Sequence, residues 1–223
     1  MTFSEVSISQ LFDAINRFPP NTETNSPRFS SPVIDQLLER IRQDGIRNDA
    51  TTAQRDRMML NITAETGEFL DRMVRECQPG RILEIGTSNG YSTIWLARAA
   101  SMCNGKVVSV DSQAWKTELA MRNVQAAELM QCVEFCTSDA GEFLSNCSPR
   151  EFDFVFLDAD RKRYARWAPA LFRALRWGTL VVDNATSHPD EMADFRACVD
   201  QCDELESHVL PIGKGQLIVR HRS

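Results

Sequence analysis

The chain has 223 residues and a net charge of −6, without a block of lysine and arginine, which argues against binding to the phosphate backbone of nucleic acids. Its hydrophobic content of 43% and charged content of 25% are ordinary for a globular protein with one full core. The sequence contains no run of about 18 apolar residues, so no membrane span is predicted. The first residues lack the basic and apolar regions of a signal peptide. A cytoplasmic protein without membrane contact is therefore expected.

Seven cysteines, an odd number without a C-x-x-C pair, do not have the spacing of a zinc site or of a disulfide framework. We expect free, mostly buried thiols in a reducing cytosol.

The first 54 residues are expected to form a helical extension and a linker. Apolar residues predict a helix over residues 4–17, and the stretch 18–32 is rich in proline, serine, threonine and asparagine, as a loop is. Pro32 then opens a second predicted helix, Val33–Gln43. The main domain, residues 55–223, would begin with a third helical region, Arg55–Glu76. These helices could cover the sheet, close over a substrate or form a dimer face.

From Arg81 onward, short apolar strands alternate with helices, which indicates an α/β fold with a doubly wound, mostly parallel sheet. The predicted strands are Arg81–Gly86, Lys106–Asp111, Val133–Ser138, Phe152–Asp158 and Thr179–Asn184, and the predicted helices are Ser92–Ala100, Thr117–Ala127, Ala140–Leu144 and Trp167–Leu175. Residues 207–220 form two further strands around Gly213-Lys214-Gly215, an antiparallel hairpin in which Lys214 is most simply a solvated turn residue.

The first predicted strand leads into a glycine turn and then a helix, the usual start of a nucleotide-type binding site. The spacing from Gly86 to Gly90 is G-x-x-x-G, not the G-x-G-x-x-G that seats a dinucleotide pyrophosphate, which disfavours an NAD-dependent dehydrogenase. Glu84, just before the turn, suits a cationic ligand better than a phosphate. The E-x-G-x-x-x-G pattern resembles motif I of the S-adenosylmethionine-dependent methyltransferases, although glycine turns after strands are common.

Ligands of an open α/β sheet lie beyond the carboxyl ends of its strands, so the acids at those ends are candidate binding residues. Asp111 ends the second strand, where a carboxylate can accept both hydroxyls of a ribose. Asp139 follows the third strand, where it would either contact the cofactor near an adenine or cap the helix that starts at Ala140.

Three oxygen-bearing side chains follow the fourth and fifth strands. Asp158 ends one strand, and Asp183 and Asn184 end the other. Two carboxylates and an amide carbonyl suit Mg²⁺, with Mn²⁺ or Ca²⁺ as alternatives, and they leave positions for a bidentate substrate. The structural alternative is that both aspartates merely cap the helices that follow.

Four motifs in order resemble the cation-dependent O-methyltransferases that act on small molecules, a group that includes the caffeoyl-coenzyme A and catechol O-methyltransferases and their bacterial relatives. The motifs are Leu83–Ser92, Leu157–Asp160, Val182–Asn184 and Leu210–Gly213, and the resemblance covers residues 55–220. It implies a Rossmann-like sheet of seven strands, S-adenosylmethionine as cofactor, a divalent cation, a small phenolic substrate and a homodimer.

The resemblance also implies roles for individual residues. Asp158, Asp183 and Asn184 would hold the cation. Asp111 would take the ribose, Glu84 and Gly86 the methionine end, and Ser92 the cofactor carboxylate. Ala140 would lie beside the adenine, Asp160 would contact the amino group, and Ile62 and Thr63 would approach from the helical cover. Thr87, in the glycine turn, is a further candidate for cofactor binding.

One position departs from that family. Its members usually carry a lysine, taken as the base or phenolate stabiliser, three residues after the first metal-binding aspartate; here Arg161 stands there and Lys162 follows. Arginine cannot act as a general base, but it could stabilise a metal-bound phenolate. Residues 161–163 could otherwise be a solvated basic turn. Trp167 and His188 are candidate substrate contacts, although aromatic residues also pack in the core and a loop histidine before proline is more often incidental.

The predicted function is therefore methyl transfer from S-adenosylmethionine to one hydroxyl of a catechol-like molecule. A catalytically silent S-adenosylmethionine-binding protein and an N-methyltransferase are the alternatives. The second is disfavoured because the fourth strand ends in Leu157-Asp-Ala-Asp160 rather than in the proline-rich motif of amino-group methylators.

Overall fold

The computed structural model describes residues 31–222, so the helix expected at 4–17 and most of the expected linker lie outside the described residues. The helices are α2 (Pro32–Thr51), α3 (Ala64–Cys77), α4 (Tyr91–Ser101), α5 (Ala114–Ala126), α6 (Ala140–Asn146), α7 (Tyr164–Ala174) and α8 (Pro189–Asp200). The strands are β1 (Arg81–Ile85), β2 (Lys106–Asp111), β3 (Val133–Thr137), β4 (Phe152–Leu157), β5 (Leu175–Val182), β6 (Leu205–Leu210) and β7 (Gln216–His221). Short 3₁₀ turns are η2 (Arg55–Arg57), η3 (Met130–Cys132) and η4 (Arg161–Arg163).

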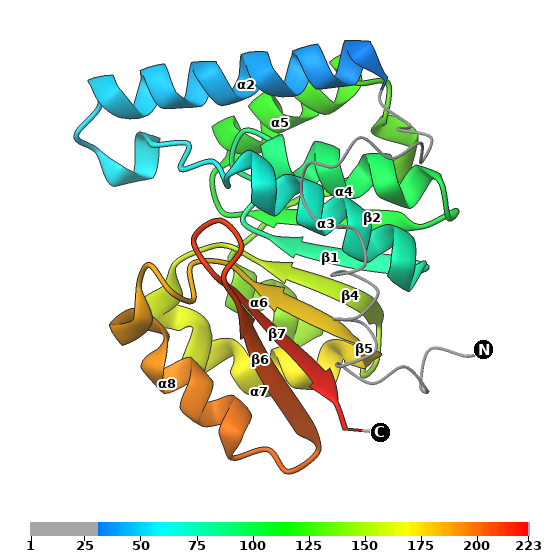
Figure 1. Ribbon diagram of the computed structural model, residues 1–223, viewed down its shortest axis with the longest axis vertical. Helices are drawn as coiled ribbons and strands as arrows, with labels where there is room; N and C mark the ends of the chain where they lie inside the picture. The colour runs from blue at the N-terminus through cyan, green and yellow to red at the C-terminus, as the bar shows by residue number, and fades with distance from the viewer. Residues whose placement is uncertain (1–30, 223) are drawn as a thin grey trace.

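One seven-stranded sheet in the order β3-β2-β1-β4-β5-β7-β6 forms the centre of the molecule (Figure 1). Strands β1 to β5 pair in parallel, and β7 pairs antiparallel with both β5 and β6. The order reverses direction at β1, so the carboxyl ends of β1 and β4 flank the crevice in which doubly wound sheets bind ligands. The predicted fold class, including the hairpin at the end, is confirmed.

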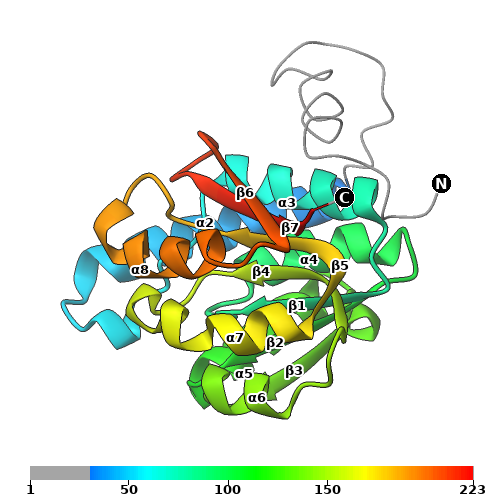
Figure 2. The same ribbon diagram turned by 90° about the horizontal axis from the view of Figure 1, so that it is seen from below.

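Helices cover both faces of the sheet, as Figure 2 shows from below. One apolar cluster lies between the sheet and the layer of α3, α4 and α2, and the second lies between the sheet and α6, α7 and α8. The central strands β1 and β4 are mostly apolar because both of their faces meet a helical layer.

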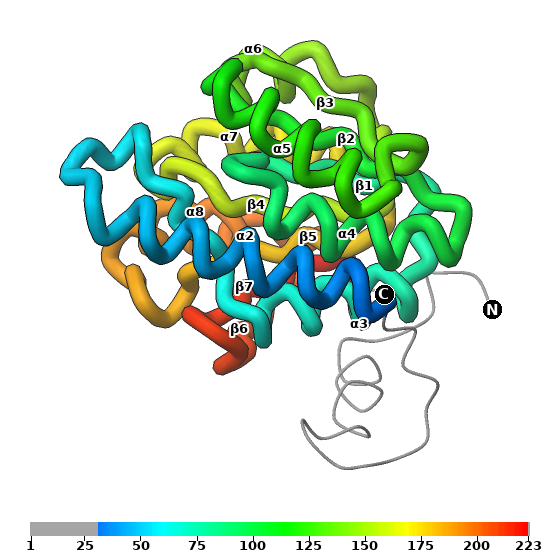
Figure 3. Tube along the Cα trace, turned by 90° about the horizontal axis from the view of Figure 1, so that it is seen from above, coloured from blue at the N-terminus to red at the C-terminus, as the bar shows by residue number. Residues whose placement is uncertain are grey.

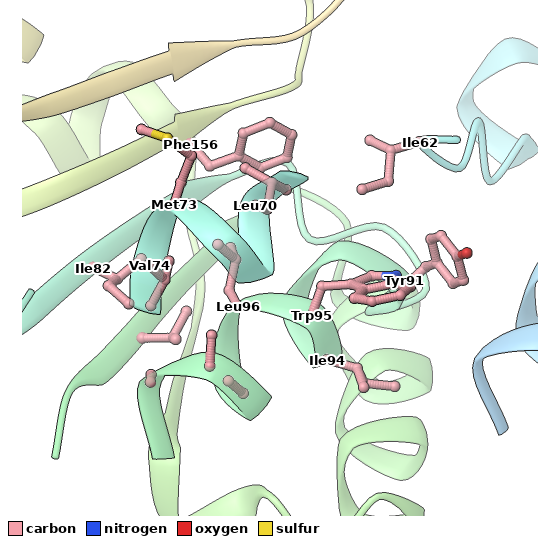
Figure 4. Packing of buried hydrophobic residues seen from close by; sticks show 14 of the residues in the cluster. Ile62, Leu70, Met73, Val74, Ile82, Tyr91, Ile94, Trp95, Leu96 and Phe156 are labelled. Carbon is pink, nitrogen blue, oxygen red and sulfur yellow. The ribbon is translucent and has the colours of Figure 1, made fainter. Parts of the chain in front are cut away.

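Helix α2 lies on the outside of the first layer, against α4 (Figure 3). Beneath it, Leu70 and Met73 of α3 are fully buried and pack towards Phe156 of β4 (Figure 4). Each such side chain contributes about 1.5–3 kcal/mol through burial. Since α2 shares this cluster with α3 and α4, residues on both sides of the expected boundary at residue 54 share one core; the boundary itself stays a prediction.

The region predicted as one helix over Arg55–Glu76 differs. It is a short 3₁₀ turn, an extended stretch at 58–63 and then α3. The Asp49 carboxylate accepts hydrogen bonds from the backbone N–H groups of Met59 and Leu60, at 2.7 and 2.9 Å, and Leu60 has a left-handed φ of 50°. Tertiary contacts with α2 therefore hold this stretch out of the helix.

Helix α8 is absent from the predicted elements, and β5 begins four residues earlier than predicted, at Leu175 rather than Thr179. All seven cysteines lie in the described part of the chain and are free; three are buried and four are partly buried. Within residues 31–222, none of the helices combines the length and the apolar character needed to span a bilayer.

Candidate functional site

A cleft of about 780 Å³ runs along the carboxyl ends of the parallel strands. This volume lies within the range of sites that enclose a drug-sized ligand. The predicted site residues that line it are Ile62, Gly86, Thr87, Ser92, Asp111, Asp139, Ala140, Asp158, Asp160, Arg161, Lys162, Trp167, Asn184 and His188. Residues from distant parts of the chain thus meet in one space.

The glycine turn between β1 and α4 forms part of the cleft wall. Gly86 has a φ of 108°, which glycine adopts without penalty, and a Cβ there would overlap the carbonyl oxygen of Asp158. Gly90, with a φ of 82°, is the N-cap of α4, and the N–H of Tyr91 in the first turn donates to Asn89 Oδ1 at 3.2 Å. Glycine at 86 therefore lets the end of β1 approach the end of β4.

Glu84 lies beneath this turn and is not among the residues that line the cleft. It is fully buried, and its carboxylate accepts hydrogen bonds from the hydroxyls of Ser92 and Thr93 at 2.5 Å and of Ser109 at 2.6 Å. Burial raises the pKa of Glu84 to about 7, although the three hydroxyls act in the opposite direction. Glu84 is thus placed where it fixes the turn, whereas the sequence suggested direct contact with the methionine end of a cofactor.

Asp111 reaches the cleft from the end of β2. Its carboxylate accepts the backbone N–H of Ser88 at 2.8 Å and that of Gln113 at 2.9 Å, so the side chain is fixed between the two loops. Carboxylate oxygens have further lone pairs, so the two hydroxyls of a ribose can still be accepted. Behind it, Lys116 donates to the Met58 carbonyl at 2.7 Å and holds the extended stretch over this end of the cleft.

Asp139 caps helix α6, the alternative that the sequence left open. Its Oδ1 accepts the N–H groups of Gly141 and Glu142, at 2.8 and 3.2 Å, while Oδ2 pairs with Arg163 at 2.7 Å. The guanidinium of Arg163 also lies over the ring of Trp167, 4.9 Å from its centroid. Trp167 therefore stands at the same end of the cleft as Asp139 and Ala140.

Asp158 and Asp183 converge at the other end, as the metal hypothesis requires. The amide nitrogen of Asn184 lies between them and donates to each carboxylate at 3.1 Å. Asn184 takes a left-handed φ of 71°, a conformation that asparagine tolerates better than most residues, and this conformation turns the chain away from β5. Neither aspartate caps the following helix, since His188 is the N-cap of α8 and Asp160 that of η4.

Electrostatics at this pair favour an added cation. Enclosure by protein atoms raises the pKa of Asp158, and the neighbouring Asp183 raises it further. The pKa of Asp183 is also raised by burial, while Gln216 Nε2, which donates to its Oδ1, acts in the opposite direction. Two acids this close oppose each other's ionisation unless positive charge lies between them.

Lys214, in the turn before β7, lines this end of the cleft. Gln216, the first residue of β7, contacts Asp183 without lining the cleft. Neither was predicted as a site residue. Gln216 is fully buried and donates to both Asp183 and Thr66. Lys214 lines the cleft, and its charge lowers the pKa of both aspartates, so it is not merely a solvated turn residue. The position of Lys214 between two glycines was the only feature of the sequence that could have indicated a role in the site.

Arg161 is not an unpaired cation beside the proposed metal ligands. It is 7% exposed, and its Nε donates to Glu191 of α8 at 2.7 Å. The notion of a wholly solvated basic turn is therefore wrong for Arg161 and Arg163, whereas Lys162 is exposed at the cleft rim. Glu191 was not predicted, because α8 itself was missed.

The remaining predicted residues are divided. Ile62 is buried and lines the cleft, but Thr63 does not line it, because its hydroxyl caps α3 by accepting the Thr66 N–H at 3.1 Å. His188 is at the rim, where its Nδ1 lies 2.9 Å from the Ser187 hydroxyl. The cleft thus has one end built on Asp111 and Ala140 and another built on Asp158 and Asn184.

Comparison with known proteins identifies the family. A family model described as O-methyltransferase matches residues 35–221. The chain belongs to this O-methyltransferase family. Among curated relatives, a catechol O-methyltransferase of Mycobacterium tuberculosis is 40% identical over 126 residues, 55% of this chain and 56% of that protein. A caffeoyl-CoA O-methyltransferase of Populus kitakamiensis is 28% identical over 131 residues, 57% of this chain and 55% of that protein.

This chain of the O-methyltransferase family thus spans little more than half the length of these curated relatives. Solved structures match more completely. An O-methyltransferase from Bacillus cereus, solved with SAH, superimposes with a TM-score of 0.72 at 21% identity and covers 99% of this chain and 100% of its own. TomG, an O-methyltransferase of Streptomyces achromogenes solved with SAM, has a TM-score of 0.68 at 22% identity, with 100% of both chains covered. At these identities the likeness shows the shared fold.

Proposed function

We propose that this protein is an S-adenosylmethionine-dependent, divalent-cation-dependent O-methyltransferase that acts on one hydroxyl of a catechol-like or other vicinal-oxygen small molecule. The observation that carries the proposal is the convergence of Asp158, Asp183 and Asn184 at one end of the cleft whose other end presents Asp111 and the glycine turn. The names of the relatives, catechol and caffeoyl-CoA O-methyltransferase, support the reaction class.

The cofactor end fits S-adenosylmethionine, which when bound supplies an electrophilic methyl group. Asp111, already fixed by two backbone N–H groups, would accept the ribose hydroxyls. The backbone of Gly86 lines the cleft, and Ala140 offers a small apolar contact for an adenine. Ser92 lies in the wall at the methionine end, where its hydroxyl also supports Glu84.

The acceptor end fits a divalent cation. The structure brings two enclosed carboxylates to either side of a single amide group, and half a turn of the Asn184 amide would present its oxygen in place of its nitrogen. Three hard oxygen ligands are the set that Mg²⁺ prefers, with Mn²⁺ possible. Such an ion lowers the pKa of a coordinated hydroxyl and aligns two substrate oxygens.

The chain's own residues would contribute positioning and charge. The two ends of the cleft would hold the cofactor and the acceptor in one orientation, which converts an encounter into a step within a complex. Arg161 adds positive charge near Asp158, but its pairing with Glu191 makes it part of the wall rather than a group that moves a proton. Exposed Lys162 at the rim is free to approach a bound acceptor.

A second candidate function is an S-adenosylmethionine-binding protein without turnover. The pairing of Arg161 with Glu191 favours it, because no lysine stands at that position to take a proton. A homodimer, a cytoplasmic location and a phenolic substrate remain proposals alongside the main one.

The test combines binding with activity. We expect calorimetry to detect S-adenosylhomocysteine binding both with and without EDTA, because separate strand ends would hold cofactor and cation. Methyl transfer to a panel of catechols should require Mg²⁺ or Mn²⁺ and stop in excess EDTA. Binding without any methyl transfer would support the silent protein, and full activity in excess EDTA would refute cation dependence.

A further inference from the structure

The use of basic residues in this chain is uneven. Arginine occurs at 21 positions and lysine at only four, Lys106, Lys116, Lys162 and Lys214, all within the described residues. Three of these four lysines line the cleft, and Lys106 lies at the opposite, amino end of β2. Lysine differs from arginine because its ammonium is a compact charge that can enter a small space and donate to a single oxygen.

Of the three, Lys214 has the most firmly held backbone. Its carbonyl accepts the N–H groups of Thr186 and Ser187, both at 3.1 Å, and the Thr186 hydroxyl at 2.8 Å. The neighbouring Gly215 carbonyl accepts the Ala185 N–H at 2.9 Å. The hairpin turn is thus fixed to the loop that follows Asn184, which places the Lys214 side chain over the same end of the cleft as the aspartates.

The side chain of Lys214 lines the cleft together with Asp158 and Asn184. Within the part of the chain that the structure describes, the Lys214 ammonium donates no hydrogen bond, whereas Arg161 is paired with Glu191. Lys116 is committed to the Met58 carbonyl near Asp111, and Lys162 is exposed at the rim.

We propose that Lys214 is a catalytic residue of this protein: its ammonium donates a hydrogen bond to the ionised acceptor oxygen beside Asp158 and Asp183. This proposal rests on the proposed function. It assigns to the β6–β7 turn a hydrogen-bond donor for the acceptor oxygen, because Arg161 is paired with Glu191. A fixed charge where an anion forms stabilises that anion without reorganisation.

The chemistry balances without a further reagent. The acceptor hydroxyl loses its proton to water through the open side of the cleft, and the oxygen anion is held by the Lys214 ammonium. That oxygen then forms a bond to the methyl carbon while the carbon–sulfur bond breaks. The electron pair of that bond stays on sulfur, so the positive sulfonium and the negative oxygen both become neutral.

The experiment follows the ionisation of 4-nitrocatechol by its absorbance when bound to the protein with Mg²⁺ and S-adenosylhomocysteine. In Lys214→Met the pKa of the bound probe should rise by about 1–3 units relative to the wild type, because an opposite charge is removed from its oxygen. Lys214→Arg should restore most of this shift. With a catechol substrate, Lys214→Met should lower kcat by about 100-fold, with S-adenosylhomocysteine affinity unchanged.

Lys106→Met is the matched control and should leave both the probe and kcat unchanged. If Lys214→Met leaves the pKa of the probe and kcat at wild-type values, the proposal is overturned. It is also overturned if the only change is tighter Mg²⁺ binding, because Lys214 would then merely offset the aspartate charges. Failure of the wild type to bind the probe would instead refute the proposed function, and Lys214 with it.

Discussion

Two groups of enclosed acids lie near each other in this molecule, and they are built differently. In the Glu84 cluster (Glu84, Ser92, Thr93 and Ser109), one carboxylate receives three hydroxyl donors. In the aspartate pair, Asp158 and Asp183 share the amide of Asn184, and Gln216 supplies one further donor to Asp183 alone.

This difference indicates that the Glu84 cluster has a structural role, whereas the aspartate pair can bind a ligand. Glu84 is close to pairing every lone pair with the chain's own groups, and it does not line the cleft, so it has little left to offer a ligand. The aspartate pair has more acceptor capacity than donors and opens to the cleft through Asp158. Burial alone thus does not make an acid a candidate ligand for a cation. It becomes one when the surrounding groups supply too few hydrogen-bond donors or positive charges to compensate its negative charge.

The largest effect should come from Asp183→Ala. Removal of one of the proposed metal ligands should lower Mg²⁺-dependent methyl transfer by more than about 100-fold, since even outer partners of ligands cost 10–100-fold. Mg²⁺ should raise the Tm of the wild type but not of the variant. Affinity for S-adenosylhomocysteine should stay within about threefold, because Asp111 and the glycine turn are untouched.

Asp190→Ala, at an exposed acid in the first turn of α8, provides the control and should behave as the wild type does. If Mg²⁺ still raised the Tm of Asp183→Ala, the aspartate pair would be a structural feature like the Glu84 cluster and not a cation site.

A smaller effect, on stability rather than on activity, is expected for Glu84→Gln. The folded-state pKa of about 7 lies above the usual 4.5, so the folded protein holds this proton to higher pH than the unfolded chain. Its contribution to the free energy of unfolding is fully present below pH 4.5 and is lost as pH rises through 7, a loss of about 3 kcal/mol.

Glutamine cannot ionise, so the variant should become more stable relative to the wild type as pH rises across this range. Urea unfolding at a series of pH values measures the difference in the free energy of unfolding between the variant and the wild type. The aspartate pair titrates in both proteins, so its contribution cancels in this difference. Glu134→Gln, on an exposed position of β3, is the matched control. A difference that does not vary with pH would show that Glu84 is ionised in the folded protein.

The smallest effect should come from Thr93→Val, which removes one hydroxyl donor from Glu84 and preserves the shape of a fully buried side chain. Since Ser92 and Ser109 remain, we expect a loss of about 1 kcal/mol in the free energy of unfolding. Cofactor affinity should not change, because Thr93 does not line the cleft. A strong loss of S-adenosylhomocysteine binding would mean that the Glu84 cluster is part of the binding site after all.

Much of the fold could be predicted because its signals are local. The strands that carry Glu84, Asp111 and Asp158 are continuous apolar runs, and they form where expected. The failures depend on contacts distant in sequence. The stretch 58–63 is extended because Asp49 and Lys116 bind its backbone. Helix α8 is an exception, because Met192, Phe195 and Val199 repeat at helical spacing on its buried face and could have predicted it.

For the site, too, local signals could be predicted and contacts distant in sequence could not. That Asp158 and Asn184 would meet followed from the rule that parallel strands end at one edge. The partners of these residues could not be read in the same manner, because Gln216 joins Asp183 across 33 positions and Glu191 joins Arg161 across 30. These partners lie on β7, which was predicted as part of a hairpin but not as a neighbour of β5, and on α8, which was not predicted.

The placement of β7 has a consequence for how the protein is made. The strand nearest the end of the sequence lies inside the sheet, between β5 and β6, and supplies Gln216 to Asp183 (Figure 1). During synthesis, therefore, Lys214 and Gln216 are added after the residues of β1, β2, β4 and β5. Because domains generally fold as units, we expect the cleft to form only once β7 has joined the sheet.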